Sequence, residues 1–216
     1  MIRYLVLGLI LSSILLGFYW GSRMPIDTIK IQGNLKHSNY PLLQDTVKQN
    51  LNGNFFTIDM NHLTDKIKQV PWILDVQIKK IWPTQINVQI TERKILAMYN
   101  KNQVLTTGDV LLPKPKKISK KILKIHSKLP IKFDDIKDYK YILKKYNLHL
   151  MAIKQEEDMA INLQIDHGVW LKTGTLFDKK TWDKRLIVIK SFLSKRNHGI
   201  KIIDLRYPLG MAITKN

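Results

Sequence analysis

ILDVQIKKIWPTQINVQITER, residues 73–93, is the stretch that decides the fold of the first part of this chain. Apolar and polar residues alternate on both sides of a turn at residues 82–84, as they do in half-buried strands. The apolar members of this pattern are Leu74, Val76, Ile78, Ile86, Val88 and Ile90. The stretch therefore predicts an antiparallel hairpin with one face in a core.

Two helices are predicted before the hairpin, because apolar residues recur there at helical spacing. The first covers about residues 40–51, with Ser38 or Asn39 as its N-cap, and the second follows Asp59 and stops at Pro71. A short β-rich strand at about residues 26–32 comes before both helices and ends at a Gly-Asn turn. The predicted unit, residues 25–93, is thus strand–helix–helix–strand–strand, with two amphipathic helices over one face of a three-stranded sheet.

A second unit is predicted for residues 95–216, and its mixture of short strands and helices gives the chain an α+β fold class. Helices are predicted near residues 136–146 and 182–193. The predicted strands comprise a hairpin at 97–107 and further strands beginning near 148, 161, 169, 200 and 211. The lysine-rich stretch 113–132 shows weak periodicity and is predicted to be a loop or a sheet edge. The fold expected here is a strand-rich domain with its helices on one face.

The N-terminus carries nineteen uncharged residues between Arg3 and Arg23. As a helix they would reach about 28 Å, close to the ~30 Å of a bilayer's hydrocarbon core. We therefore predict a transmembrane helix over residues 4–22, a short cytoplasmic tail at residues 1–3, and an exported C-terminal body. A cleaved secretory signal is the alternative, but no clean pair of small residues precedes a cut site.

The composition is strongly basic, with 36 Lys and Arg against 17 Asp and Glu and a net charge of +19. Such a chain attracts polyanions, so nucleic-acid binding is an alternative function. No zinc-finger spacing or aromatic RNA-binding strand supports it. The chain has no cysteine, which excludes disulfides, thiolate chemistry and cysteine-based zinc sites.

Motifs of catalysis and cofactor binding are missing from the sequence. The six histidines never lie three or four residues apart, and there is no HExxH, GxSxG, GxGxxG or phosphate-cradling glycine loop. The adjacent pairs Asp134-Asp135 and Glu156-Glu157 diverge on a helix or strand and are more typical of solvated surface. The sequence therefore predicts no enzyme, no cofactor and no metal site, and favours a scaffold that binds other proteins.

Several strings of the chain resemble the FtsQ family (DivIB in some bacteria) of single-pass bacterial division proteins. The strings are IKIQGN (29–34), NFFTID (54–59), PWI (71–73), WP (82–83), ER (92–93) and IDLRY (203–207). Their order and spacing are similar to the POTRA domain of that family followed by the end of its C-terminal β domain. The resemblance covers nearly the whole chain.

The resemblance implies a non-enzymatic, bitopic protein of the bacterial inner membrane, with its C-terminal body in the periplasm at the division septum (type II topology). It implies FtsB and FtsL as partners, with FtsK, FtsW and FtsI as further division proteins that it contacts. In this role the protein links early cytoplasmic to late periplasmic members of the septal machinery.

A partner-binding edge is expected at the end of the chain. The free edge of the last strand would pair with an incoming segment by strand addition. Arg206 would pair with a carboxylate, and Tyr207 would pack and form hydrogen bonds; alternatively, both residues merely support a closing turn. The predicted binding residues are Arg206, Tyr207, Leu209, Gly210, Met211, Ala212, Ile213 and Thr214. Gly33 and Asn34 are predicted as contacts of the POTRA domain with other division proteins.

Some positions depart from the pattern of the family. Glu156-Glu157 lies near a position that is basic in some relatives, and Lys215 replaces an aromatic residue, so partner contacts there are expected to differ. An outer-membrane assembly or secretion factor is the remaining alternative, since POTRA domains also serve there. That function expects repeated POTRA units, for which 216 residues with a single unit leave no room.

Overall fold

The structure is a computed structural model that describes residues 2–21, 25–119, 121–129, 131–174, 179–195, 199–207 and 210–215. The chain divides into two compact units, residues 1–93 and 94–216.

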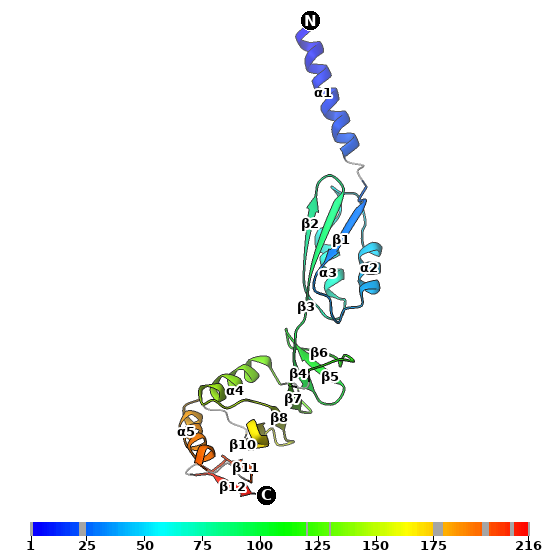
Figure 1. Cartoon of the computed structure of the whole chain (residues 1–216). Coiled ribbons are helices and arrows are strands. Elements are labelled where there is room, and N and C mark those ends of the chain that lie inside the picture. The colour runs from blue at the N-terminus through cyan, green and yellow to red at the C-terminus, as the bar shows by residue number, and fades with distance from the viewer. Residues whose placement is uncertain are drawn as a thin grey trace. The chain divides into compact units, whose positions relative to one another are not determined.

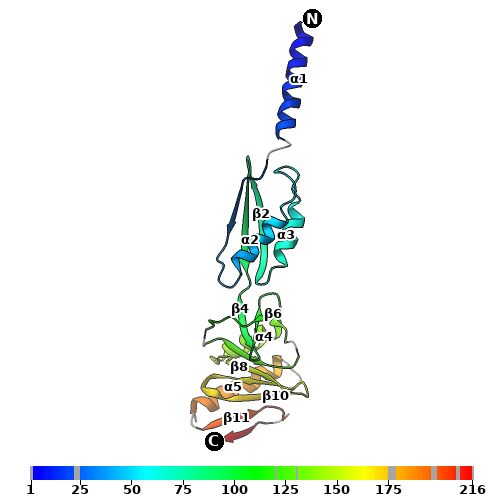
Figure 2. The same ribbon diagram turned by 90° about the vertical axis from the view of Figure 1, so that its right-hand side faces the viewer.

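The first unit has a three-stranded sheet in the order β1-β3-β2, with β1 parallel and β2 antiparallel to β3. Figure 1 and Figure 2 show α2 and α3 together on one face of this sheet. Its elements are α1 (Ile2–Gly21), β1 (Thr28–Gln32), α2 (Tyr40–Gln49), α3 (Met60–Lys68), β2 (Ile73–Ile81) and β3 (Gln85–Glu92). Residues 28–92 therefore confirm the predicted strand–helix–helix–strand–strand order.

Capping and patterning explain why these elements form. Asn39 caps α2 by accepting a hydrogen bond from the Leu42 N–H, and Asp59 caps α3 through the N–H groups of Asn61 and His62. Most of the alternating residues of the hairpin face the two helices and form one core. Its most deeply buried members are Leu43, Val47, Leu63, Ile67, Ile73, Ile86, Val88 and Ile90. Leu74, predicted to share this face, is exposed, because the register shifts between Ile73 and Asp75 and Ile73 is buried instead.

Of residues 4–22, predicted to be a transmembrane helix, residues 4–21 lie in α1 and residue 22 lies outside the described residues. Within the residues that the structure describes, no helix combines the length and the apolar character needed to cross a membrane. The structure thus places a helix at these residues.

A carboxylate clamp holds the loop between β1 and α2. Glu92, the last residue of β3, accepts hydrogen bonds from the backbone N–H groups of Lys36 (2.8 Å), His37 (3.1 Å) and Ser38 (2.7 Å). Burial alone would raise the pKa of Glu92, but the hydrogen bonds from Ser38, Lys36 and His37 outweigh it and hold that pKa below its ordinary value. Glu92 therefore ties the loop to β3 as a charged acceptor.

The second unit is built on a nine-stranded sheet in the order β12-β11-β10-β9-β8-β7-β4-β5-β6. Its first elements are β4 (Ile95–Tyr99), β5 (Gln103–Thr106), β6 (Val110–Pro113), β7 (Leu123–His126) and α4 (Phe133–Lys145). These are followed by β8 (Ala152–Gln155), β9 (Ile161–Gln164), the 3₁₀ turn η1 (Asp166–Gly168), β10 (Trp170–Gly174), α5 (Lys179–Lys195), β11 (Ile200–Asp204) and β12 (Ala212–Lys215).

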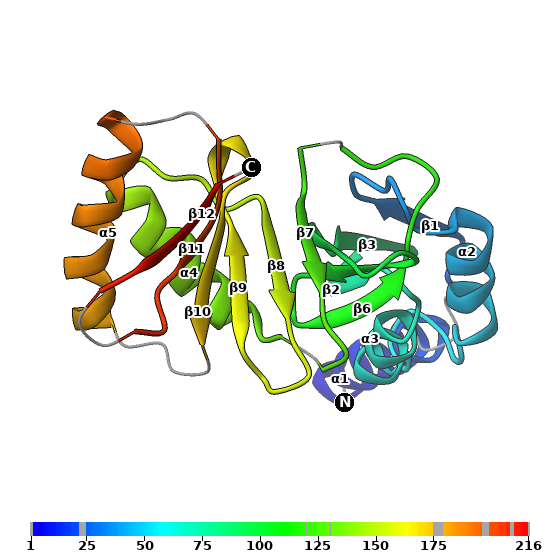
Figure 3. The same cartoon turned by 90° about the horizontal axis from the view of Figure 1, so that it is seen from below.

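The two helices of this unit lie on one face of its sheet, as predicted. Tyr139 of α4 and Trp182 of α5 meet with ring centroids 6.4 Å apart, and both helices share a single core with the strands. Figure 3 shows β8 to β12 in sheet order, with β12 at the end of the row and α4 and α5 on one side. The strand order makes β12 a terminal strand of the sheet.

The prediction of a loop or edge over residues 113–132 is wrong for β7, which lies inside the sheet between β4 and β8. Leu123 and Ile125 are buried in the core, whereas Lys124 and His126 are exposed. The strand has only four residues, so its alternation gives two apolar positions within a lysine-rich stretch. A pattern this short does not stand out in the sequence.

Candidate protein-binding edge

The last strand of the chain, β12, has one neighbour in the described sheet. It pairs antiparallel with β11, with Ala212 opposite Asp204, Ile213 opposite Ile203 and Thr214 opposite Ile202. Its other side is the edge of the nine-stranded sheet. Such an edge presents backbone N–H and C=O groups that can pair with another strand.

The backbone of Ile213 faces this open side. The N–H of Leu205 donates to the carbonyl of Lys172 in β10 (2.8 Å), so Leu205 and, by alternation, Ile203 direct their backbone groups toward β10. Asp204 therefore directs its backbone groups toward β12 and pairs there with Ala212. Because the direction alternates along β12 as well, the N–H and C=O of Ile213 point away from β11.

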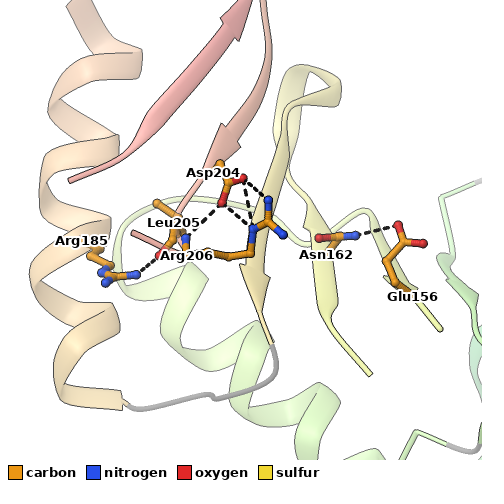
Figure 4. A network of polar contacts seen from close by, with 6 residues as sticks. All are labelled: Glu156, Asn162, Arg185, Asp204, Leu205 and Arg206. Atoms are coloured by element: carbon orange, nitrogen blue, oxygen red, sulfur yellow. Dashed lines mark hydrogen bonds and ion pairs between the residues drawn. The ribbon is translucent and has the colours of Figure 1, made fainter. Parts of the chain in front are cut away.

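The segment that leads from β11 toward β12 is held by an arginine–carboxylate pair (Figure 4). The guanidinium of Arg206 donates to buried Asp204 through Nε (2.9 Å to Oδ1) and Nη2 (2.6 Å to Oδ2). These bonds keep the pKa of Asp204 below its ordinary value, against the effect of burial. Arg206, predicted to pair with a partner's carboxylate, is thus already engaged by the carboxylate of Asp204, the last residue of β11.

A second arginine clamps the same segment from α5. Arg185 donates from Nη1 to the carbonyl of Leu205 and from Nη2 to the carbonyl of Tyr207 (3.1 Å). Figure 4 shows it reaching from the helix toward Leu205. The two arginines fix the backbone at residues 205–207, while the Tyr207 side chain is 54% exposed. The geometry therefore separates a structural Arg206 from an accessible Tyr207.

The structure brings most of the predicted edge residues together. Gly210, Ala212 and Thr214 are exposed, and Met211 and Ile213 are half-buried, because the side chains of the last two pack against the core. Predicted Leu209 lies outside the described residues. Sequence reasoning missed Asp204 and the clamp by Arg185. The i, i+2 spacing of Asp204 and Arg206 was a usable signal, since such residues share a face of a strand.

Two of the residues predicted to alter partner contacts, Glu156 and Glu157, already have partners within the unit. Glu156 accepts from Asn162 Nδ2 (2.9 Å) and pairs with Lys154 (2.9 Å), and Glu157 pairs with Lys128. Figure 4 shows the pair of Asn162, in β9, and Glu156, which directly follows β8. Lys215 is exposed at the end of β12.

Gly33 and Asn34 lie in the other unit, at the end of β1. A Cβ on Gly33 would lie 2.5 Å from the Ile90 carbonyl oxygen, so this position requires glycine for close backbone approach. Asn34 is exposed. The reason for Gly33 is therefore packing within its own unit.

Ligand-holding groups are sparse in the part of the chain that the structure describes. No cluster of three or more His, Asp or Glu side chains there could hold a metal ion. A pocket of about 480 Å³ between α4, η1 and α5 contains one polar pair, His149 Nδ1 and Asp166 Oδ2 at 3.1 Å. What this unit offers is a backbone edge with an aromatic side chain beside it.

Comparison with known proteins adds to this geometry. The family model described as POTRA domain, FtsQ-type, matches residues 24–93. The chain is 27% identical over 206 residues to the cell division protein FtsQ of Aliivibrio fischeri, covering 88% of this chain and 76% of that protein. It is 24% identical over 218 residues to FtsQ of Vibrio cholerae, covering 97% and 82%, respectively. With FtsQ of Neisseria gonorrhoeae it shares 21% identity over 210 residues, covering 95% and 86%.

Proposed function

The chain is a non-enzymatic cell-division protein of the FtsQ family, and from that premise we propose that it is a membrane-attached scaffold of the bacterial division septum. Its C-terminal unit captures other division proteins, FtsB and FtsL first, by adding one of their segments to β12 as a further strand. One observation carries this proposal: the described sheet ends at β12, with the backbone of Ile213 directed outward.

The proposed capture works through backbone pairing with side-chain support. A backbone carbonyl of the incoming strand would accept a hydrogen bond from the Ile213 N–H, and a backbone N–H of that strand would donate to the Ile213 carbonyl. These main-chain hydrogen bonds give affinity that does not depend on the partner's sequence. Tyr207 would supply apolar contact and a hydroxyl at one end of the added strand. The Asp204–Arg206 pair and Arg185 hold the backbone that leads to this edge, so that the edge is preorganised before the partner arrives.

Tyr207→Ala is expected to weaken capture of a periplasmic FtsB fragment about tenfold, the effect typical of losing an aromatic contact at an interface. The thermal melt followed by circular dichroism should change little, because the ring is 54% exposed. Tyr141→Ala is the matched control, since Tyr141 on α4 is 74% exposed and lies outside the proposed edge. Equal affinity of both variants for FtsB would remove Tyr207 from the site.

Attachment to the inner membrane is proposed for α1. Its apolar side chains are exposed along the helix, and apolar surface of this extent marks contact with a membrane or a partner. The exposed residues include Leu7, Leu9, Ile10, Leu11, Ile14, Leu15 and Leu16. In the proposed topology the residues after α1 lie in the periplasm.

Membrane attachment predicts that the full chain stays in the membrane fraction after an alkaline wash. The double variant Leu11→Lys, Leu15→Lys should be released, because two charges cost several kcal/mol in an apolar environment. The conservative pair Leu11→Val, Leu15→Val should stay bound. Release of the unmodified chain by the wash would contradict attachment through α1.

The POTRA domain is the second contact surface in this proposal, directed at FtsK, FtsW or FtsI. Asn34, exposed beside the Gly33 turn, stays a predicted contact for one of them. Gly33 would contribute by shaping the turn, since its own position is explained by the close approach to Ile90.

A further inference from the structure

An exposed apolar cluster lies at one end of the POTRA sheet. Trp82 is 73% exposed, Phe56 52% and Ile81 42%, although each is large and apolar. Ile81 and Trp82 form the tip between β2 and β3. Phe56 lies at the same end of the sheet, because its carbonyl accepts a hydrogen bond from Nζ of Lys80, the residue before Ile81 in β2 (3.3 Å). We call Phe56, Ile81 and Trp82 the hairpin-tip cluster.

The covalent chain places the hairpin-tip cluster near the end of α1. The Asp27 N–H donates to the carbonyl of Thr84, two residues after Trp82, at 3.0 Å. α1 ends at Gly21, six residues before Asp27, so about 21 Å of extended chain at most separates the two. Whatever surface holds the end of α1 therefore lies within reach of the tip.

We infer that the hairpin-tip cluster inserts its apolar side chains at the headgroup level of the membrane to which α1 is attached. Tryptophan is enriched at this level because its ring is apolar and its N–H is polar. Lys79 and Lys80 flank the tip and suit anionic headgroups, while Asp27 and Asp59 at the same end oppose them. The apolar side chains, more than net charge, carry the contact. The inference rests on the proposed attachment of α1.

A fluorescent label on the full chain tests the contact. The chain has no cysteine, so Lys79→Cys carries a single label next to the tip. Lys36→Cys is the matched control, because it removes the same charge toward the opposite end of the sheet. Lys79 lies opposite Asn87 and the Lys36 N–H is bound by Glu92, so about 17 Å of β3 separates the two positions. Both proteins are reconstituted into vesicles of phosphatidylethanolamine and phosphatidylglycerol that contain a headgroup-level spin-labelled lipid.

Quenching of the label at position 79 is expected to exceed quenching at position 36 severalfold. Adding Trp82→Ser, or separately Phe56→Ser, should reduce quenching at position 79 toward the control, with an unchanged melt. Equal quenching at both positions in chains that float with the vesicles would overturn the inference and leave the cluster to a protein partner. If the chains do not float with the vesicles, α1 does not attach them to the membrane and the inference is overturned with it. Flotation therefore distinguishes failure of the α1 attachment from failure of the contact at the tip.

Discussion

Replacing Ile213 with proline is expected to lower the affinity for FtsB about 100-fold, or about 2.8 kcal/mol, while the C-terminal sheet stays folded. The Ile213 N–H points away from β11, so its loss breaks no bond within the chain. Proline is tolerated on an edge strand at such a position. For an added strand, the same change removes a donor, leaves a partner carbonyl unpaired and places a ring in its path.

Two control variants separate the loss of the outward N–H from the loss of side-chain packing and of a hydrogen bond within the sheet. Ile213→Ala keeps the N–H but loses the packing of the side chain against the core, so it should lower stability more than partner affinity. Thr214→Pro removes an N–H directed toward β11 and should destabilise the end of the sheet itself. Partner affinity would be measured by calorimetric titration of the full chain, and folding by circular dichroism. If the Ile213 proline and alanine variants bind equally well, strand addition at β12 is not the binding mode.

The parts of the fold that rest on local pattern were predictable from the sequence. Alternation and helical spacing identified β2, β3, α2, α3 and the terminal strand, because each pattern needs only neighbouring residues. β7 was missed, since two buried residues in a lysine-rich stretch become a strand only through pairing with β4 and β8. Sheet order of this kind is set by tertiary packing.

In the candidate site, too, the contacts that depend on tertiary packing were not predicted from the sequence. The edge position of β12 followed from the family resemblance, and the sheet order places it there. The pairing of Arg206 with Asp204 was not predicted, because the sequence does not say which carboxylate, internal or external, Arg206 meets. Arg185 lies 20 and 22 residues before the carbonyls that it binds, and no sequence spacing specifies such a contact.

Glu92 is the second position at which we expect a large effect, and its partners lie 54 to 56 residues away. Glu92→Gln should lower the stability of the POTRA domain by about 3 kcal/mol at neutral pH, because three backbone donors lose a charged acceptor. The most direct measurement is hydrogen exchange at the amides of residues 36–38, which should become faster in the variant. Glu157→Gln, the same change at an exposed carboxylate, should leave the POTRA domain unaffected.

The effect of Glu92 also has a defined pH dependence. The pKa of Glu92 is lower in the folded protein than its ordinary value of 4.5, so the folded state binds this proton more weakly than the unfolded state does. Its stabilisation is therefore fully present above pH 4.5 and is lost as the pH falls through the lowered folded-state pKa. The difference in free energy of unfolding between the unmodified chain and Glu92→Gln should therefore become smaller as the pH falls from 4.5 through the folded-state pKa. A difference that stays constant down to the acid transition would show that the hydrogen bonds act without the charge.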